Sequence, residues 1–523
     1  MGQQEECSSL SAEPISRQSL PDISQPITTN EHEHLTVGSP PSGWSFYLVL
    51  AAIVTTLGSS LPVGYNIGVI NTPAANIQRF CNSSFLSRYG VQLDEASMNI
   101  LWSSVVAIFI VGGCTGSILG SVLADKLGRK KATILTNLLS IAGAALFCTC
   151  RAANSVEMLV LGRLLVGLSG GLTTSIVPMY LTELSPTGLT GTMGAACPVG
   201  VNVGVLVGQV MGLDFLLGGV NDWPYLLSAF VILVIICLPI LFILPESPKY
   251  LYVVKKRENE ALNELHRLRG VSPSALVEDV ESLKEEGRAG SGGWGMCRAL
   301  RSPRLRLPLM LVCALQAGQQ TSGINAVFYY SQTIFENAGA TARVAAYATV
   351  ACGAVNVCTA LGLARVLPTA GRRPLLLAST AAAAVLLTAL AASIAAMNYV
   401  WWMSYVCMSA VVAYVFVYGL GLGPIPYFIA SEIFEVAPRG AGMAWGSLAN
   451  WGGNFLVGMC FPSLRAAIGP ACFLIFAGTT AALFCFVKVY FPETRGKSPT
   501  QVTELCARGL ASRPLLGLPV DQA

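Results

Sequence analysis

The sequence predicts an all-α membrane protein with twelve transmembrane helices, arranged as two six-helix bundles joined by a charged helical loop. Three observations lead to this prediction. Of the 523 residues, 53% are hydrophobic and only 11% are charged, against roughly 25% charged residues in soluble domains. Uncharged apolar runs long enough to cross a hydrocarbon core of about 30 Å recur along the chain. Short motifs of the first half also return in the second half at a nearly constant offset.

The apolar runs predict the individual spans. In the first half they lie near 44–70, 99–123, 132–150, 157–180, 190–212 and 223–244. In the second half they lie near 307–334, 343–364, 374–396, 400–430, 440–463 and 467–490. The resulting domains are a disordered cytoplasmic tail over 1–42, an N-terminal six-helix bundle over 43–248, a cytoplasmic linker with short helices over 249–306, a C-terminal six-helix bundle over 307–491 and a cytoplasmic tail over 492–523.

The basic residues predict the orientation, because Lys and Arg concentrate in cytoplasmic loops. The linker contains the segment KKRENEALNELHRLRG, so we place it in the cytoplasm together with both ends of the chain. The longest outer loop then carries Asn82-Ser83-Ser84, an acceptor pattern for N-glycosylation.

Three pairs of motifs indicate an internal repeat. They are Gly128-Arg129-Lys130 with Gly371-Arg372-Arg373, Glu183 with Glu432, and Pro245-Glu246-Ser247 with Pro492-Glu493-Thr494. Their offsets of 243, 249 and 247 residues predict a duplicated bundle with a pseudo-two-fold axis normal to the membrane. Such symmetry suits two halves that rock about a central site.

The stretch 316–331, QAGQQTSGINAVFYYS, places several amides inside a predicted span. An amide removed from water without a partner costs roughly 2 kcal/mol or more, so these side chains need polar neighbours, a water-filled cavity or a ligand. Gln316, Gln319 and Gln320 share one helix face, whereas an ideal helix turns Asn325 to the opposite side. Unwinding or twisting at Gly323 would bring Asn325 back.

Several function classes are disfavoured. Only three His occur, in the tail or the linker, and no nucleophile, metal or phosphate motif is found. We therefore expect neither an enzyme nor a cofactor or metal site. The net charge of +4 does not indicate a nucleic-acid partner. Most of the sixteen cysteines lie in apolar runs, where Cys acts as a small hydrophobe. The expected partners are a small solute and the lipid bilayer, and the sequence predicts no oligomeric state.

The chain resembles the animal facilitative glucose transporters, in the sugar porter branch of the major facilitator superfamily. The resemblance runs from about Trp44 to Pro499 and rests on ordered motifs. They are GYNIGVIN at 64, DKLGRKK at 125, LGRLLVG at 161, VPMYLTELSP at 177, PESPKYL at 245, QQTSGINAVFYYS at 319, GPIPYF at 423, NWGGNFLVGMCFP at 450 and PETRG at 492. The resemblance implies the major facilitator fold and alternating access.

By this resemblance, the sugar hydroxyls are bound by Gln319, Gln320, Asn325, Asn356, Tyr427, Gln316 and Asn454, and the outer gate is Tyr329 and Tyr330. An amide both donates and accepts hydrogen bonds, so it can pair with adjacent hydroxyls without adding a charge. The inner gate is implied to be Glu183, Arg129, Glu246, Arg372, Arg373, Glu432 and Arg439, which pair between helices when the cavity opens outward.

The chain departs from the family pattern at several positions. Tyr427 replaces the usual Trp, Gly419 replaces a Glu, and Pro198 replaces a Gln. At the inner gate, Thr190 matches an Arg and Pro368 an acidic residue, which predicts a weakened latch.

The resemblance also bears on proton coupling and on cargo. Proton-coupled sugar porters have Asp where this chain has Asn66, which cannot titrate, so downhill uniport is favoured over symport. Arg163, which matches a family arginine, has either a functional charge or an orienting role. We expect facilitative transport of a hexose, D-glucose before fructose, across the plasma membrane. A fructose-preferring facilitator and a sugar sensor that binds without net transport are the alternatives.

Overall fold

The computed structural model describes residues 43–70, 73–213, 215–270, 276–288, 294–328, 335, 341–367, 369–397 and 399–506. The predicted tail over 1–42, the predicted outer-gate residues Tyr329 and Tyr330, and the substituted position Pro368 lie outside these residues. Within the described ranges the chain is helical and contains no strand.

The helices of the first half follow the predicted spans closely. They are α1 (Phe46–Thr55) and α2 (Leu61–Gly68), which together form one span, then α3 (Ala74–Tyr89), α4 (Glu95–Leu127), α5 (Arg129–Cys150), α6 (Val156–Leu184), α7 (Thr190–Met211), α8 (Trp223–Ser228) and α9 (Val231–Ile243). Helix α3 was not predicted, because its sequence is polar and was assigned to the outer loop. It ends at Gly90, whose φ of +67° is readily adopted by glycine.

The second half repeats this order. Its helices are α13 (Arg306–Thr321), α15 (Ala342–Val366), α16 (Arg372–Ala396), α17 (Met403–Leu420), α18 (Ile425–Ile433), α19 (Val436–Ile468) and α20 (Cys472–Tyr490). Among the described residues, nine stretches are long and apolar enough to cross a membrane. The three remaining predicted spans correspond to α13, α15 and α19.

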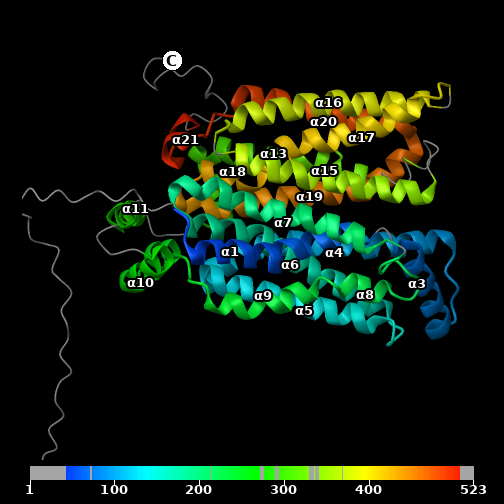
Figure 1. Cartoon of the computed structure of the whole chain (residues 1–523), viewed down its shortest axis with the longest axis horizontal. Helices are drawn as coiled ribbons and strands as arrows, with labels where there is room; N and C mark the ends of the chain where they lie inside the picture. Colours follow the sequence, from blue (N-terminus) through cyan, green and yellow to red (C-terminus); the bar gives the residue numbers. More distant parts are fainter. Residues whose placement is uncertain are drawn as a thin grey trace, which may run out of the picture. The chain divides into compact units, whose positions relative to one another are not determined.

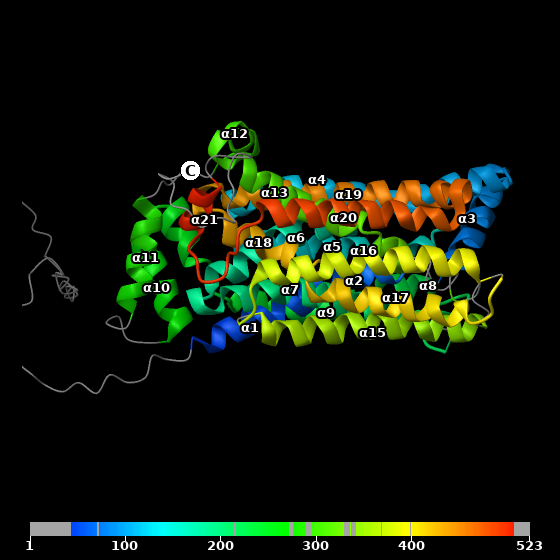
Figure 2. The same cartoon turned by 90° about the horizontal axis from the view of Figure 1, so that it is seen from above.

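The linker forms short helices, as its spacing of leucines on a polar background predicted. They are α10 (Glu258–Arg269), α11 (Val277–Arg288) and α12 (Met296–Arg301). A further helix that the sequence did not predict, α21 (Pro499–Leu505), begins with a capping box between Ser498 and Gln501 and packs against α18. Helices α10, α11 and α21 lie at one end of the bundles and α3 at the other (Figure 2). We call the first of these the linker end.

The unit formed by residues 42–523 places its two halves side by side (Figure 1). They touch mainly where α4 meets α19 and where α7 meets α15. At the first contact Gly113 faces the Trp451 ring, and a Cβ at Gly113 would lie 2.5 Å from that ring. Hydroxyls also link the two halves here, since Ser447 on α19 lies 2.8 Å from Ser117 on α4 and 3.1 Å from Thr174 on α6. These contacts enclose the central site.

Candidate functional site: an amide-lined cavity between the two halves

A cavity of about 800 Å³, its opening included, lies between the two halves. The first half lines it from α2, α6 and α7, and the second half lines it from α13, α15, α17, α18, α19 and the segment that follows α13. Among the described lining residues none has an ionisable carboxylate, ammonium, guanidinium or imidazole. The site is therefore suited to a neutral polar solute.

The helix break predicted at Gly323 is present in the structure. Helix α13 ends at Thr321, and the chain resumes helical conformation at residues 324–328. Gly323 has a φ of +81°, which is strained for any residue with a Cβ. As a result Asn325 turns back toward α13, and its Nδ2 donates to Gln320 Oε1 at 2.7 Å and to Asn454 Oδ1 at 3.0 Å.

The amides form a connected ladder between α13 and α19. Gln320 donates to Asn450 Oδ1 at 3.2 Å, and Asn450 Nδ2 donates to Gln316 Oε1 at 2.9 Å and to Gln319 Oε1 at 2.5 Å. Asn450 was not among the predicted site residues, although it opens the motif NWGGNFLVGMCFP. The ladder orients Gln320 and Asn450 toward the cavity, which both of them line. Polar networks of this kind are stable in an apolar interior when their members are satisfied.

Gln316 and Gln319 have different neighbours from Gln320. Gln319 Nε2 donates to the carbonyls of Leu422 and Gly423, and Gln316 Nε2 donates to the carbonyl of Pro426 at 2.8 Å. The Leu422 and Gly423 carbonyls lie at the break between α17 and α18, where Pro426 cannot donate to Leu422, and the Pro426 carbonyl lies in the first turn of α18. Neither glutamine is among the described residues that line the main cavity, although Gln316 lines a smaller cavity beside it. The two glutamine amides therefore donate hydrogen bonds to backbone carbonyls at and beside this break.

The structure distributes the other predicted site residues over the cavity wall. Asn325, Asn356, Tyr427 and Asn454 all line it. The first half adds residues that the sequence analysis missed, namely Thr174, Asn202 and Gln209, together with apolar side chains of α2 and α7. No motif of the sequence analysis included these three residues.

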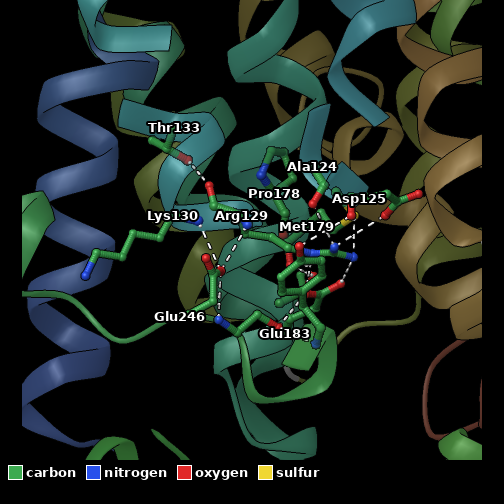
Figure 3. A network of polar contacts seen from close by, with 12 residues as sticks. Ala124, Asp125, Arg129, Lys130, Thr133, Pro178, Met179, Glu183 and Glu246 are labelled. Carbon is green, nitrogen blue, oxygen red and sulfur yellow. Dashed lines mark hydrogen bonds and ion pairs between the residues drawn. The ribbon is translucent and has the colours of Figure 1, made fainter. Parts of the chain in front are cut away.

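At the linker end of the first half, a buried triad joins three helix ends (Figure 3). Arg129 makes a bidentate pair with Glu183, from Nε to Oε2 at 2.9 Å and from Nη2 to Oε1 at 3.0 Å. Glu246 Oε1 accepts from the backbone N–H groups of Arg129 and Lys130 at 2.9 and 3.1 Å. Burial raises the pKa of Glu246, while its hydrogen bonds and the Arg129 charge act in the opposite direction. We call Arg129, Glu183 and Glu246 the N-half triad.

The second half repeats this geometry. Arg372 pairs with Glu432, from Nη2 to Oε1 at 2.9 Å, and Glu493 Oε1 accepts from the Arg372 backbone N–H at 2.9 Å. Glu493 was not predicted as a gate residue. It is the repeat counterpart of Glu246, so the offset between the two halves could have identified it. We call Arg372, Glu432 and Glu493 the C-half triad. Arg373 joins it only through its backbone N–H, which donates to Glu493 Oε2 at 3.2 Å.

Each triad connects helices within its own half. The C-half triad nevertheless reaches the first half, because a Cβ at Gly191 would lie 2.9 Å from Arg372 Nη2. Thr190 is the neighbour of Gly191, and its hydroxyl donates to the Pro186 carbonyl at 3.2 Å. Arg439 is buried, and its Nε donates to the Phe434 carbonyl at 3.4 Å.

Arg163 packs beside Asn66 inside the first half. Its Nη1 donates to the Asn66 carbonyl at 3.1 Å, and its guanidinium lies 4.4 Å from the centroid of the Phe109 ring. These contacts fit an orienting role, since they fix α6 against α2 and α4.

The predicted glycosylation site lies at the opposite end from the linker. Asn82 is half-buried in α3, and its Oδ1 accepts from the Leu93 backbone N–H at 3.2 Å. Ser84, the third residue of the acceptor pattern, donates to the Asn154 carbonyl at 2.8 Å. Glycosylation of Asn82 stays a prediction.

Comparisons with known proteins identify the family. The family model described as "Sugar (and other) transporter" matches residues 51–505. The human solute carrier family 2, facilitated glucose transporter member 4 is 40% identical over 465 residues, which cover 87% of this chain and 90% of that protein. Member 1 from Gallus gallus is 38% identical over 468 residues, covering 89% and 94%.

A solved structure has a similar fold. The proton:xylose symporter XylE bound to 6-bromo-6-deoxy-D-glucose matches with a TM-score of 0.76 at 22% identity, covering 88% of this chain and 99% of that chain. The predicted all-helical major facilitator fold and the predicted membership in a family of transporters rather than enzymes are thus confirmed. The chain belongs to the sugar transporter family and is a multi-pass membrane protein related to the facilitated glucose transporters.

Proposed function

We propose that the protein is a facilitative uniporter that carries a hexose, D-glucose before fructose, by alternating access. The observation that carries this proposal is the uncharged, amide-lined cavity between two repeated halves. Relatives at about 40% identity are named facilitated glucose transporters, which favours glucose as the cargo.

The cavity chemistry supports a neutral sugar. Gln320, Asn325, Asn450 and Asn454 present amides that can donate to and accept from hydroxyls, and Tyr427 presents an aromatic ring. Each hydrogen bond contributes roughly 0.5–1.5 kcal/mol net. Several of them, less the cost of association, correspond to a dissociation constant of about millimolar order, near −4 kcal/mol. Weak binding suits a carrier that must release its cargo on both sides.

The surroundings of Arg163 support uniport rather than proton symport. Its neighbour Asn66 is an amide, which cannot carry a proton at any accessible pH. A proton-coupled carrier needs a titratable group in the membrane. With amides lining the cavity and Asn66 beside Arg163, the cargo gradient alone would drive transport.

Flux into proteoliposomes tests the proposal. Purified protein should equilibrate labelled D-glucose faster than empty liposomes do, with the same initial rate whether or not a pH gradient is imposed. A parallel assay with labelled fructose ranks the two sugars. Hexose binding without flux would contradict transport and favour a sugar sensor, and a rate that rises with an inward proton gradient would contradict uniport.

We also propose the orientation and location. The linker and both chain ends face the cytoplasm, the end with α3 faces outward, and the membrane is the plasma membrane. The basic residues of α10 and α12 support this, because they gather at the linker end. Protease protection of the linker in sealed cells, with loss of the Asn82 glycan after Asn82→Gln, tests the orientation.

A further inference from the structure

We propose that Gln209 is a sugar-binding residue of the first half, whose side-chain carbonyl accepts a hydrogen bond from a hexose hydroxyl opposite Asn356. This inference rests on the proposed function and adds to it a specific contact from the wall that otherwise offers few polar groups.

The Gln209 carbonyl is buried and has no donor. Gln209 is 9% exposed, lies near the end of α7 and lines the central cavity. Its Oε1 has no hydrogen-bond partner among the described residues. A buried acceptor left unpaired costs about 1–3 kcal/mol, so such groups in a binding cavity indicate where a ligand donates.

A second orphan acceptor faces the same cavity from the other half. Asn356 on α15 is 3% exposed, and its Oδ1 also lacks a partner among the described residues. Gly353 lies one turn earlier on α15, on the same face as Asn356. A Cβ at Gly353 would overlap Gln209 Oε1. The two carbonyls therefore belong to one region, where α7 of the first half meets α15 of the second.

The chemistry of this region differs from that of the amide ladder. Asn325, Gln320 and Asn450 already hydrogen-bond within the ladder, so only part of the hydrogen-bonding capacity of their amides is left for a sugar. Gln209 Oε1 and Asn356 Oδ1 are carbonyl oxygens, which can accept hydrogen bonds but cannot donate them. The ligand atoms that bind them must therefore be hydroxyl donors. A ring oxygen or a fluorine cannot take this role, since neither carries a proton to donate. Because the two carbonyls come from different halves, a sugar that donates to both would join the halves.

Monodeoxy and monodeoxyfluoro derivatives of D-glucose test the contact in proteoliposomes, through their inhibition constants against labelled glucose. Wild type should bind one deoxy derivative about tenfold more weakly than glucose, and the fluoro derivative at the same carbon should be equally weak. In Gln209→Met that penalty should shrink to about twofold or less, while the penalties at other carbons persist. Val210→Ala, also on α7 but not among the described residues that line the cavity, is the matched control and should keep the full pattern.

Gly353→Ala provides a second variant, because its Cβ displaces the Gln209 carbonyl without changing that residue. Like Gln209→Met, this variant should lose most of the weaker binding that wild type shows for the deoxy derivative at that one carbon. An unchanged pattern in both variants, or a parallel loss at every carbon, overturns the inference while glucose transport by wild type still stands. A fluoro derivative that binds as well as glucose at the affected carbon also overturns it, since Gln209 would then be donating. A wild-type protein that neither binds nor carries a hexose overturns the proposed function and this inference together.

Discussion

Replacing Gly323 by Ala tests how the site is built, because the helix break after α13 contains the positive φ of this residue. At its φ of +81° a residue with a Cβ is strained by about 1–2 kcal/mol. The new Cβ would also lie 2.5 Å from Cδ2 of the Phe476 ring, and overpacking of this kind costs about 1–3 kcal/mol. Together they predict a destabilisation of about 2–5 kcal/mol, or a shift of Asn325 away from Gln320 and Asn454.

Two measurements separate these outcomes. Thermal unfolding of purified protein in detergent reports the lost stability, and equilibrium hexose binding reports the displaced Asn325. Gly478→Ala is the matched control, because Gly478 lies in α20 with open space around its Cβ position. The double variant Gly323→Ala with Phe476→Ala relieves the clash but keeps the backbone strain. If Gly323→Ala melts and binds hexose like Gly478→Ala, the helix break has no role in forming the site.

Three further substitutions give distinct expected results. Glu183→Ala leaves the buried Arg129 guanidinium without its bidentate partner and should cost about 3–5 kcal/mol, seen as a lower melting temperature. Thr190→Arg adds a cation beside the C-half triad and should favour closure of the linker end, so that ligand binding from the opposite end tightens; each 1.4 kcal/mol corresponds to about tenfold. Gln319→Leu removes the donor to the Leu422 carbonyl and should cost about 1–3 kcal/mol of stability.

Each of these has its own control. Arg257→Ala breaks an exposed ion pair and should leave the melting temperature unchanged, so equal effects from Glu183→Ala would contradict the buried-pair argument. Thr190→Gln supplies length without charge, and the same affinity gain there would exclude electrostatic closure. Gln320→Leu should weaken hexose binding more than Gln319→Leu does, because only Gln320 lines the main cavity; the reverse order would refute the division of roles.

Much of the architecture could be predicted because it depends on local properties of the chain. Uninterrupted apolar runs specify spans wherever backbone groups must be satisfied inside a helix. The repeated Gly-Arg motif and the paired glutamates predicted an internal repeat, and the structure forms an equivalent triad in each half, although Glu493 was not predicted as a member. Gly323 was anticipated as a break because only a glycine tolerates the backbone needed to turn Asn325 toward its neighbours.

The sequence by itself determined the spans, the two repeated halves and a set of amides inside one predicted span. Only the tertiary structure decided which amide serves which purpose. Gln319 and Gln320 are adjacent in the chain, yet the first satisfies carbonyls at the break before α18 and the second faces the cavity. Gln209 became a candidate sugar-binding residue only because the structure packs α7 against α15. The physical reason is that helical periodicity acts over a few residues, whereas hydrogen-bond partners depend on helices packed together from distant parts of the chain.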